Sequence, residues 1–136
     1  MPKDIENRDD IVLLVDNFYA NVMTSPTIGY FFSDVVRVDW SVHLPKMYAF
    51  WETMLFDKRT YTQAPYMPHY DVNEIQPLTE VEFNEWLTLF HESVDEYFVG
   101  KVAEKAKLKA ISVAKVMMRK IHNLENFEFE NFKNMK

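Results

Sequence analysis

The chain has 136 residues and a formal charge of −6, and 48% of its residues are hydrophobic, which predicts one folded domain over residues 1–136. It contains no cysteine and only two glycines, so disulfides, thiolate-bound metals and glycine-rich phosphate loops are excluded. The negative charge disfavours nucleic acid as a partner, while the charged N-terminus and the lack of a long apolar run predict no membrane contact and a cytoplasmic location.

The first predicted helix spans about residues 9–23. Asp9 and Asp10 can supply its N-cap and a negatively charged first turn. Its apolar residues recur at the spacing of one helix face, and they are Ile11, Leu14, Val15, Phe18 and Val22. Tyr19 lies on the same side of this helix. A short second helix that carries Phe32 is expected after the Ser-Pro pair that follows.

A histidine lies on the aromatic face of the next predicted helix. The residues on this face are Trp40, His43, Met47, Phe50, Trp51 and Met54. The helix is expected to begin near Ser41, because Pro45 lacks a backbone donor and is tolerated best in the opening turns. A buried imidazole needs a hydrogen-bond partner, a metal or a ligand. His43 is therefore either a core residue bonded to a carbonyl group or part of a binding site.

Residues 57–77 form a connector with several prolines and with His69 in its middle. Connectors of this length in a compact domain are usually functional or contain a short helix. Because His69 belongs to a separate segment, it can face His43 across a gap. It is either the axial ligand of a flat aromatic cofactor or a solvated connector residue.

Two further helices complete an all-α pattern of five or six helices. Thr79-Glu-Val-Glu82 has the form of a capping box and opens a helix that includes Trp86. Gly100 separates that helix from a last one, which is rich in small residues that allow close helix packing. The tail over residues 123–136 alternates acidic and aromatic residues, and it can extend the helix, dock or remain mobile.

The four histidines do not form the usual patterns of protein-bound metals. A Glu-x-x-His motif is absent, because the residues three positions before the histidines are Trp40, Tyr66, Thr88 and Arg119. The His-Glu-x-x-His and Gly-x-Ser-x-Gly motifs are absent too, which removes zinc-dependent and serine-dependent hydrolysis. A cofactor such as haem, held by a single axial histidine, is the metal chemistry that remains.

Several motifs occur in an order typical of one family. They are Phe18-Tyr19-x-x-Val22, Ile28-Gly29-x-x-Phe32, Trp40-x-x-His43-Leu-Pro-x-Met47-Tyr-x-Phe-Trp51, Pro65-x-x-x-His69, Pro77-Leu-Thr-x-x-x-Phe83-x-x-Trp86-Leu-x-Leu-Phe90 and Val94-Asp-Glu-x-Phe98-x-Gly100. Over about residues 8–122 the chain thereby resembles the group III truncated haemoglobins. Glu85 departs from the pattern, because some members have a basic residue there. The tail over 123–136 lies outside the resemblance.

The resemblance implies a globin-like, two-over-two helical sandwich around haem b. It implies that His69 is the proximal ligand of the iron and that Tyr19 and Trp86 donate hydrogen bonds to the bound ligand. It implies that His43 acts as a gate or a further polar contact on the distal side. The remaining expected pocket residues give apolar contacts to the haem or wall the pocket, and they are Phe18, Phe32, Met47 and Trp51.

The function implied is the binding of dioxygen or another diatomic gas, with nitric oxide detoxification or peroxidase-like redox chemistry. Such turnover would need a reductase, and a monomer is favoured. Two alternatives stay open. One is an electron-transfer protein in which His43 and His69 both ligate the iron, and the other is a haem-free helical interaction module.

Overall fold

The computed structural model describes residues 2–30, 39–56, 78–124 and 126–132. Its α-helices are α1 (Arg8–Met23), α2 (Trp40–Phe56), α4 (Glu80–Tyr97) and α5 (Lys101–His122), and a 3-10 helix, η2, spans Glu130–Phe132. The all-α prediction is confirmed. The predicted helix near Phe32 and the connector with His69 fall wholly or mainly outside the described residues.

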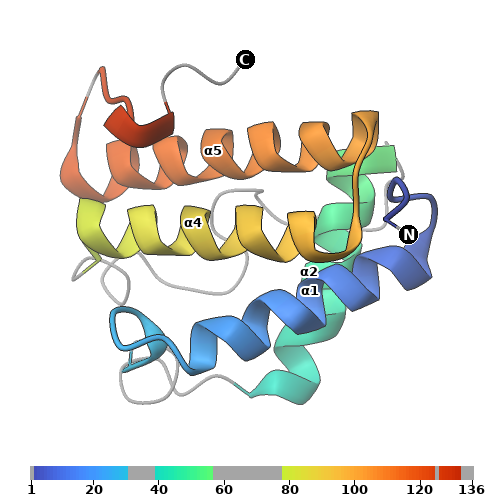
Figure 1. Ribbon diagram of the computed structural model, residues 1–136. Helices are drawn as coiled ribbons and strands as arrows, with labels where there is room; N and C mark the ends of the chain where they lie inside the picture. Colours follow the sequence, from blue (N-terminus) through green and yellow to red (C-terminus); the bar gives the residue numbers. More distant parts are fainter. Residues whose placement is uncertain (1, 31–38, 57–77, 125, 133–136) are drawn as a thin grey trace.

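The helices are arranged as two packed pairs. α4 and α5 lie antiparallel and side by side, and α1 contacts both α2 and α4 (Figure 1). α2 crosses α1 and reaches α5 with its other end. Small residues on the inner face of α5 allow the close approach of α4, and they are Ala103, Ala106, Ala110 and Ala114. This is the predicted two-over-two arrangement, and its core contains the side chains that α1, α2 and α4 direct inward.

The start of α1 differs from the prediction. Asn7 is the N-cap, and its Oδ1 accepts a hydrogen bond from the backbone N–H of Asp10 at 3.0 Å. Asp9 and Asp10 lie in the first turn, which confirms its predicted negative charge. The carboxylate of Asp10 is engaged elsewhere, because it contacts Lys3 Nζ at 2.5 Å and accepts from the backbone N–H of Glu6 at 2.8 Å. Asn7, Asp9 and Asp10 can each cap a helix. Because Lys3 and Glu6 engage the Asp10 carboxylate, Asn7 provides the cap.

The starts of α2 and α4 agree with the local signals. The capping box at Thr79 is confirmed, because the Thr79 hydroxyl accepts from Val81 and the Glu82 carboxylate accepts from the Thr79 backbone at 2.7 Å. α2 begins at Trp40, where the side chain of Asp39 accepts from the backbone N–H of Ser41 at 3.1 Å. Pro45 lies in the second turn of α2, near the expected place.

The N-terminus of α5 is capped by a residue from the other end of the chain. Gly100 precedes α5 at φ 141° and has no side chain to cap it. Asp4 supplies the cap, because its carboxylate accepts from the backbone N–H groups of Val102 at 3.0 Å and Ala103 at 2.8 Å. A Cβ atom at position 100 would overlap the Asp4 side chain. The N-terminal segment is thereby attached to the helix that forms one wall of the fold.

Replacing Asp4 with alanine is expected to lower the free energy of unfolding by about 1 kcal/mol, the usual cost of losing a helix cap. The measurement is the urea midpoint at constant slope. Glu92 is an exposed carboxylate on α4 and provides a control for lost charge. An Asp4→Ala protein that is no less stable than Glu92→Ala would contradict the capping role.

The same contact predicts acid sensitivity. Desolvation raises the pKa of Asp4, but the hydrogen bonds from Val102 and Ala103 outweigh it and leave the pKa below 3.8. A lowered folded-state pKa stabilises the protein above pH 3.8, and this stabilisation is lost as the pH falls through the folded-state pKa. Asp4→Asn should therefore have a flatter dependence of unfolding free energy on pH below 4 than the parent protein.

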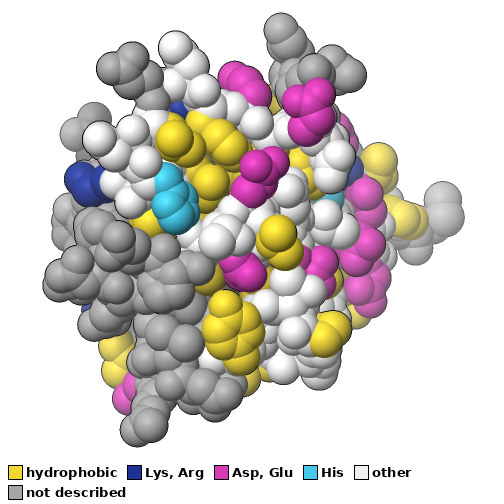
Figure 2. All heavy atoms as spheres, turned by 90° about the vertical axis from the view of Figure 1, so that its left-hand side faces the viewer, with side chains coloured by type: hydrophobic (Ala, Val, Ile, Leu, Met, Phe, Trp, Pro, Cys, Tyr) yellow, Lys and Arg dark blue, Asp and Glu magenta, His cyan; other side chains and the backbone are white. Residues whose placement is uncertain are grey.

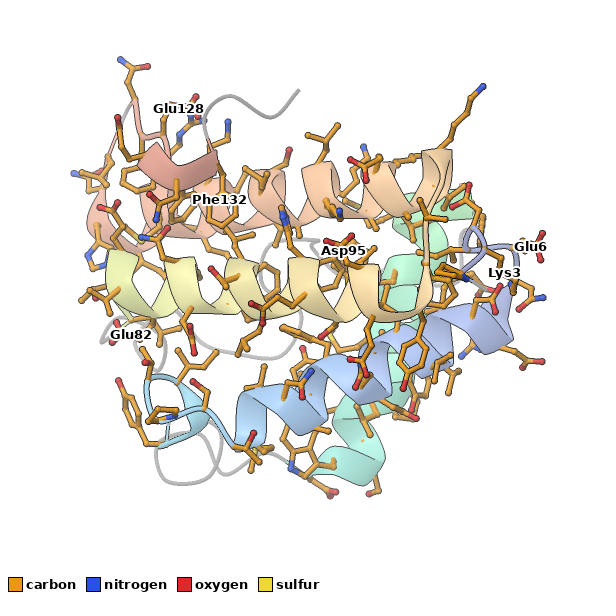
Figure 3. All side chains as sticks on the ribbon, in the orientation of Figure 1. Lys3, Glu6, Glu82, Asp95, Glu128 and Phe132 are labelled. Atoms are coloured by element: carbon orange, nitrogen blue, oxygen red, sulfur yellow. The ribbon has the colours of Figure 1, made fainter. Side chains whose placement is uncertain are left out.

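The C-terminal tail docks against α4 and α5. Phe129 is fully buried, and Lys115 of α5 pairs with Glu128 at 3.0 Å. The ring of Phe132 meets His91 of α4 edge to face, with centroids 5.1 Å apart. In Figure 3, Glu128 lies above the C-terminal part of α5, and Phe132 lies between α5 and α4 in this view. The sequence allowed the tail to extend the last helix, to dock or to remain mobile. The structure shows that residues 126–132 dock.

The end of the molecule where α4 begins and α5 ends has a mixed surface. Hydrophobic side chains lie between acidic ones on this face (Figure 2). Acidic groups here would repel a polyanion. Among the helices that the structure describes, none has the length and apolar character needed to span a membrane.

Candidate functional site

Tyr19 of α1 and His43 of α2 meet inside the fold. Their rings lie edge to face with centroids 5.1 Å apart. Trp40 completes a group of three rings, since its centroid is 5.2 Å from that of Tyr19 and 5.4 Å from that of His43. The crossing of α1 over α2 produces this group, because Tyr19 and His43 each lie on the face that its helix directs toward the other. The phenol and the imidazole predicted to share a site are thus brought together.

Both polar rings of this pair are buried. Tyr19 is 8% exposed and His43 is 4% exposed. Burial raises the pKa of Tyr19 well above its ordinary value of 10. The phenol therefore keeps its proton at neutral pH and can donate a hydrogen bond. A donor in a dry apolar setting interacts more strongly with a partly negative ligand than one in water.

Trp86 of α4 joins this group through Phe18. The Phe18 ring is 4.8 Å from the Tyr19 ring and 5.6 Å from the Trp86 ring, with an edge-to-face geometry toward the indole. Trp86 also stacks on Phe90 at 6.0 Å and 16°. The indole is therefore held between an α1 ring and an α4 ring, and it remains partly exposed. α1 contributes the Tyr19 phenol, α2 the rings of Trp40 and His43, and α4 the Trp86 indole, and Phe18 lies between Tyr19 and Trp86.

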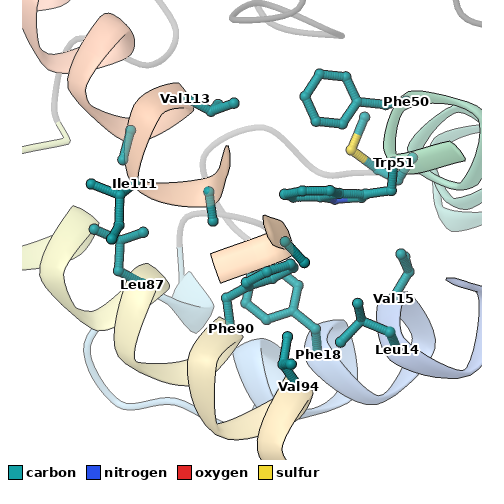
Figure 4. Packing of buried hydrophobic residues seen from close by; sticks show 14 of the residues in the cluster. Leu14, Val15, Phe18, Phe50, Trp51, Leu87, Phe90, Val94, Ile111 and Val113 are labelled. Carbon is teal, nitrogen blue, oxygen red and sulfur yellow. The ribbon is translucent and has the colours of Figure 1, made fainter. Parts of the chain in front are cut away.

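Met47 and Trp51 continue the buried face of α2. Met47 is 4% exposed and follows His43 by one turn. Trp51 is 3% exposed and stacks on Phe90 of α4, with ring centroids 4.7 Å apart and an interplanar angle of 20°. Figure 4 shows Trp51, Phe18 and Phe90 together in the core. Trp51 therefore joins α2 to α4, in addition to any part it has in a pocket wall.

Two of the predicted site residues, Phe32 and His69, lie outside the described residues. The two remaining histidines lie away from the Tyr19–His43 pair. His122 Nε2 is 2.7 Å from the carbonyl oxygen of Leu78, and His91 contacts the docked tail. Neither was given a role from the sequence.

Two aromatic residues of the site were not identified as functional from the sequence. Trp40 lies on the predicted stripe of α2, and its spacing of three residues from His43 was the available signal. Phe90 contacts Phe18, Trp51 and Trp86, so three helices meet on its ring. Its place on the helical face of α4 predicts burial, but only the packing of α1 and α2 shows that it links the site residues.

Three similarities to known proteins agree with this geometry. Residues 4–120 match the family model of the bacterial-like globins. The group 3 truncated hemoglobin ctb of Campylobacter jejuni subsp. jejuni is 29% identical over 92 residues, which are 65% of this chain and 70% of that protein. A crystal structure of the group III truncated hemoglobin from Campylobacter jejuni is similar with a TM-score of 0.74 and 22% identity, over 93% of this chain and all of that chain. Because the family model matches residues 4–120 of the 136 residues, the chain belongs to the bacterial-like globin family.

Proposed function

We propose that this globin binds haem b and, with it, a small diatomic gas whose retention is controlled by Tyr19 and Trp86. The observation that carries the proposal is the buried contact between Tyr19 and His43, two polar rings 5.1 Å apart among aromatic side chains. A phenol and an imidazole among apolar rings can orient a small ligand by hydrogen bonds, as the few polar groups of an otherwise apolar pocket do.

The chemistry of these residues fits haem. The macrocycle is a large flat aromatic group, and the ring-lined surface of Phe18, Trp40, Tyr19 and Trp86 suits contact with such a group. The polar atoms are few and come from a phenol, an imidazole and two indoles, as expected for a pocket that binds an uncharged gas. His69 is proposed as the iron ligand because of its place in the family motif.

When bound, haem supplies an iron that coordinates the gas. Tyr19 would donate a hydrogen bond to the gas, and the raised pKa of the phenol would keep the proton on its oxygen. The indole N–H of Trp86 is a second donor, and His43 admits the ligand or adds a polar contact. The apolar contacts are proposed to come from Phe32, Met47 and Trp51.

The energies of these hydrogen bonds favour retention over transport. A hydrogen bond to a partly charged group contributes about 1.5–3 kcal/mol. Two such bonds slow the loss of dioxygen by on the order of 10²-fold or more, since about 1.4 kcal/mol corresponds to a factor of ten. A protein that holds oxygen so long suits oxygen-dependent chemistry. We propose nitric oxide dioxygenation or peroxidase-like turnover, with electrons from a reductase.

The test is an absorption titration of the purified protein with hemin. We expect saturation at one equivalent, with a shifted and sharpened Soret band. A colourless protein that leaves the hemin spectrum unchanged would refute the proposal and favour a haem-free interaction module. A low-spin spectrum of the reduced protein without added ligand would assign both His43 and His69 to the iron and favour electron transfer instead.

A further inference from the structure

A ladder of hydrogen bonds connects the α1 side of the fold to α4. Asn17 donates to Glu96 at 3.0 Å, and Asn21 donates to Ser93 at 3.3 Å. The last contact of the ladder runs from Ser25 Oγ to Glu85 Oε2 at 2.8 Å. The residue numbers rise from Asn17 to Ser25 on one side and fall from Glu96 to Glu85 on the other, as in an antiparallel pair. These contacts therefore restrain the position of α4 along the axis of α1.

Ser25 is a rigid anchor for this contact. It is 9% exposed and lies just beyond the C-cap of α1, with its backbone N–H bonded to the carbonyl oxygen of Val22 at 3.0 Å. Its hydroxyl oxygen also accepts from the backbone N–H groups of Thr27 at 3.2 Å and Ile28 at 3.4 Å. The hydroxyl proton is thus directed to Glu85 while the turn holds the oxygen in place.

Glu85 immediately precedes Trp86 on α4. Both residues belong to the same turn of α4, so the contact of Glu85 with Ser25 restrains the rotation and axial position of that turn, and with it the backbone from which the Trp86 side chain extends. Phe18 and Phe90 contact the indole ring, but apolar ring contacts allow sliding and tilting more readily than a short hydrogen bond does. The carboxylate therefore adds the directional restraint that these ring contacts lack.

We propose that the Ser25–Glu85 hydrogen bond is a positioning contact that sets the orientation of the Trp86 indole toward the bound gas. The inference rests on the proposed function, because it assumes that Trp86 donates to that ligand. Glu85 does not touch the ligand and acts through its neighbour. Loss of the contact should weaken the Trp86 hydrogen bond without removing the donor, so its effect should be smaller than that of Trp86→Phe.

The experiment compares ferrous protein with and without the contact, using dioxygen and carbon monoxide as probes. Glu85→Ala should raise the oxygen dissociation rate about threefold to tenfold and raise the C–O stretching frequency, because a weaker hydrogen bond draws less electron density into the antibonding orbitals of the C–O bond. It should also shift the indole N–H resonance of Trp86 in the carbon monoxide form. Glu85→Gln keeps an oxygen acceptor for Ser25 and should restore all three values.

Asn17→Ala is the matched control. It removes the first contact of the ladder, between α1 and α4 and ten positions along α4 from Trp86, and should leave the rate, the stretching frequency and the indole resonance unchanged. In the Trp86→Phe background, Glu85→Ala should add nothing, since the group that it positions is gone. An equal effect in both backgrounds would overturn the inference.

Two outcomes separate failure of this inference from failure of the proposed function. If Trp86→Phe changes the oxygen rate and the C–O frequency but Glu85→Ala changes neither, the positioning contact is refuted and the role of Trp86 stands. If Trp86→Phe changes neither, the donor role itself is refuted, and the positioning contact with it.

Discussion

Replacing His69 with glycine is expected to lower haem affinity by more than about 100-fold, the largest effect predicted for a single residue. Loss of even an outer-shell partner of a metal-binding histidine costs about 10- to 100-fold in affinity, so loss of the ligand itself should cost more. The measurement is a hemin titration monitored at the Soret band. Added imidazole should restore the spectrum, because it can occupy the space of the deleted ring and ligate the iron.

His122→Gln is the matched control for the His69 variant. His122 lies at the end of α5 and bonds to the carbonyl oxygen of Leu78 at 2.7 Å, a contact that a glutamine amide can replace. Haem affinity should be unchanged in this protein. Circular dichroism of both variants without haem would verify that the helices are retained. A His69→Gly protein that binds haem with the parent spectrum and affinity would assign the iron to another residue.

Tyr19→Phe is expected to raise the oxygen dissociation rate by about 10- to 100-fold. The change deletes one hydroxyl group and retains the ring, so the contacts with Phe18, Trp40 and His43 remain. The lost hydrogen bond to a partly charged ligand contributes about 1.5–3 kcal/mol, which corresponds to this range. The measurement is stopped-flow displacement of dioxygen by carbon monoxide.

Tyr48→Phe is the control for the loss of a tyrosine hydroxyl. Tyr48 lies on α2, and its hydroxyl donates to Asp16 near the surface. This variant should keep the parent oxygen dissociation rate. Because burial raises the pKa of Tyr19 far above 10, the phenol should stay protonated between pH 6 and pH 9, so the difference in rate between Tyr19→Phe and the parent should persist across that range. An unchanged rate in Tyr19→Phe would refute the proposed donor role of the phenol.

Local sequence patterns predict the helices and the faces that they bury. The capping box at Thr79 needs only residues within one turn, and the apolar spacing of α1 needs only residues within the helix. The family motifs predict that Tyr19 and His43 share a ligand site, and periodicity places each residue on an inward face, but neither predicts that the two rings touch. The structure supplies that contact through the crossing of α1 and α2.

Contacts between distant parts of the chain could not be predicted from those patterns. Asp4 caps α5 across 98 positions, and Ser25 meets Glu85 across 60. Many residues in the sequence have the right chemistry for such bonds, and only the packed backbone places one pair within reach. The N-cap of α1 depends on nearer contacts, since Lys3 and the backbone of Glu6 occupy the Asp10 carboxylate and Asn7 caps the helix.

The sequence by itself determined the helical class, the apolar faces, the family motifs and the types of side chain available for a pocket, because these depend on residue identity and short-range spacing. The tertiary structure alone decided which rings touch, which carboxylate caps which helix, and that residues 126–132 of the tail dock on α4 and α5. Those outcomes depend on how whole helices pack, and the free energy of packing is a property of the complete fold.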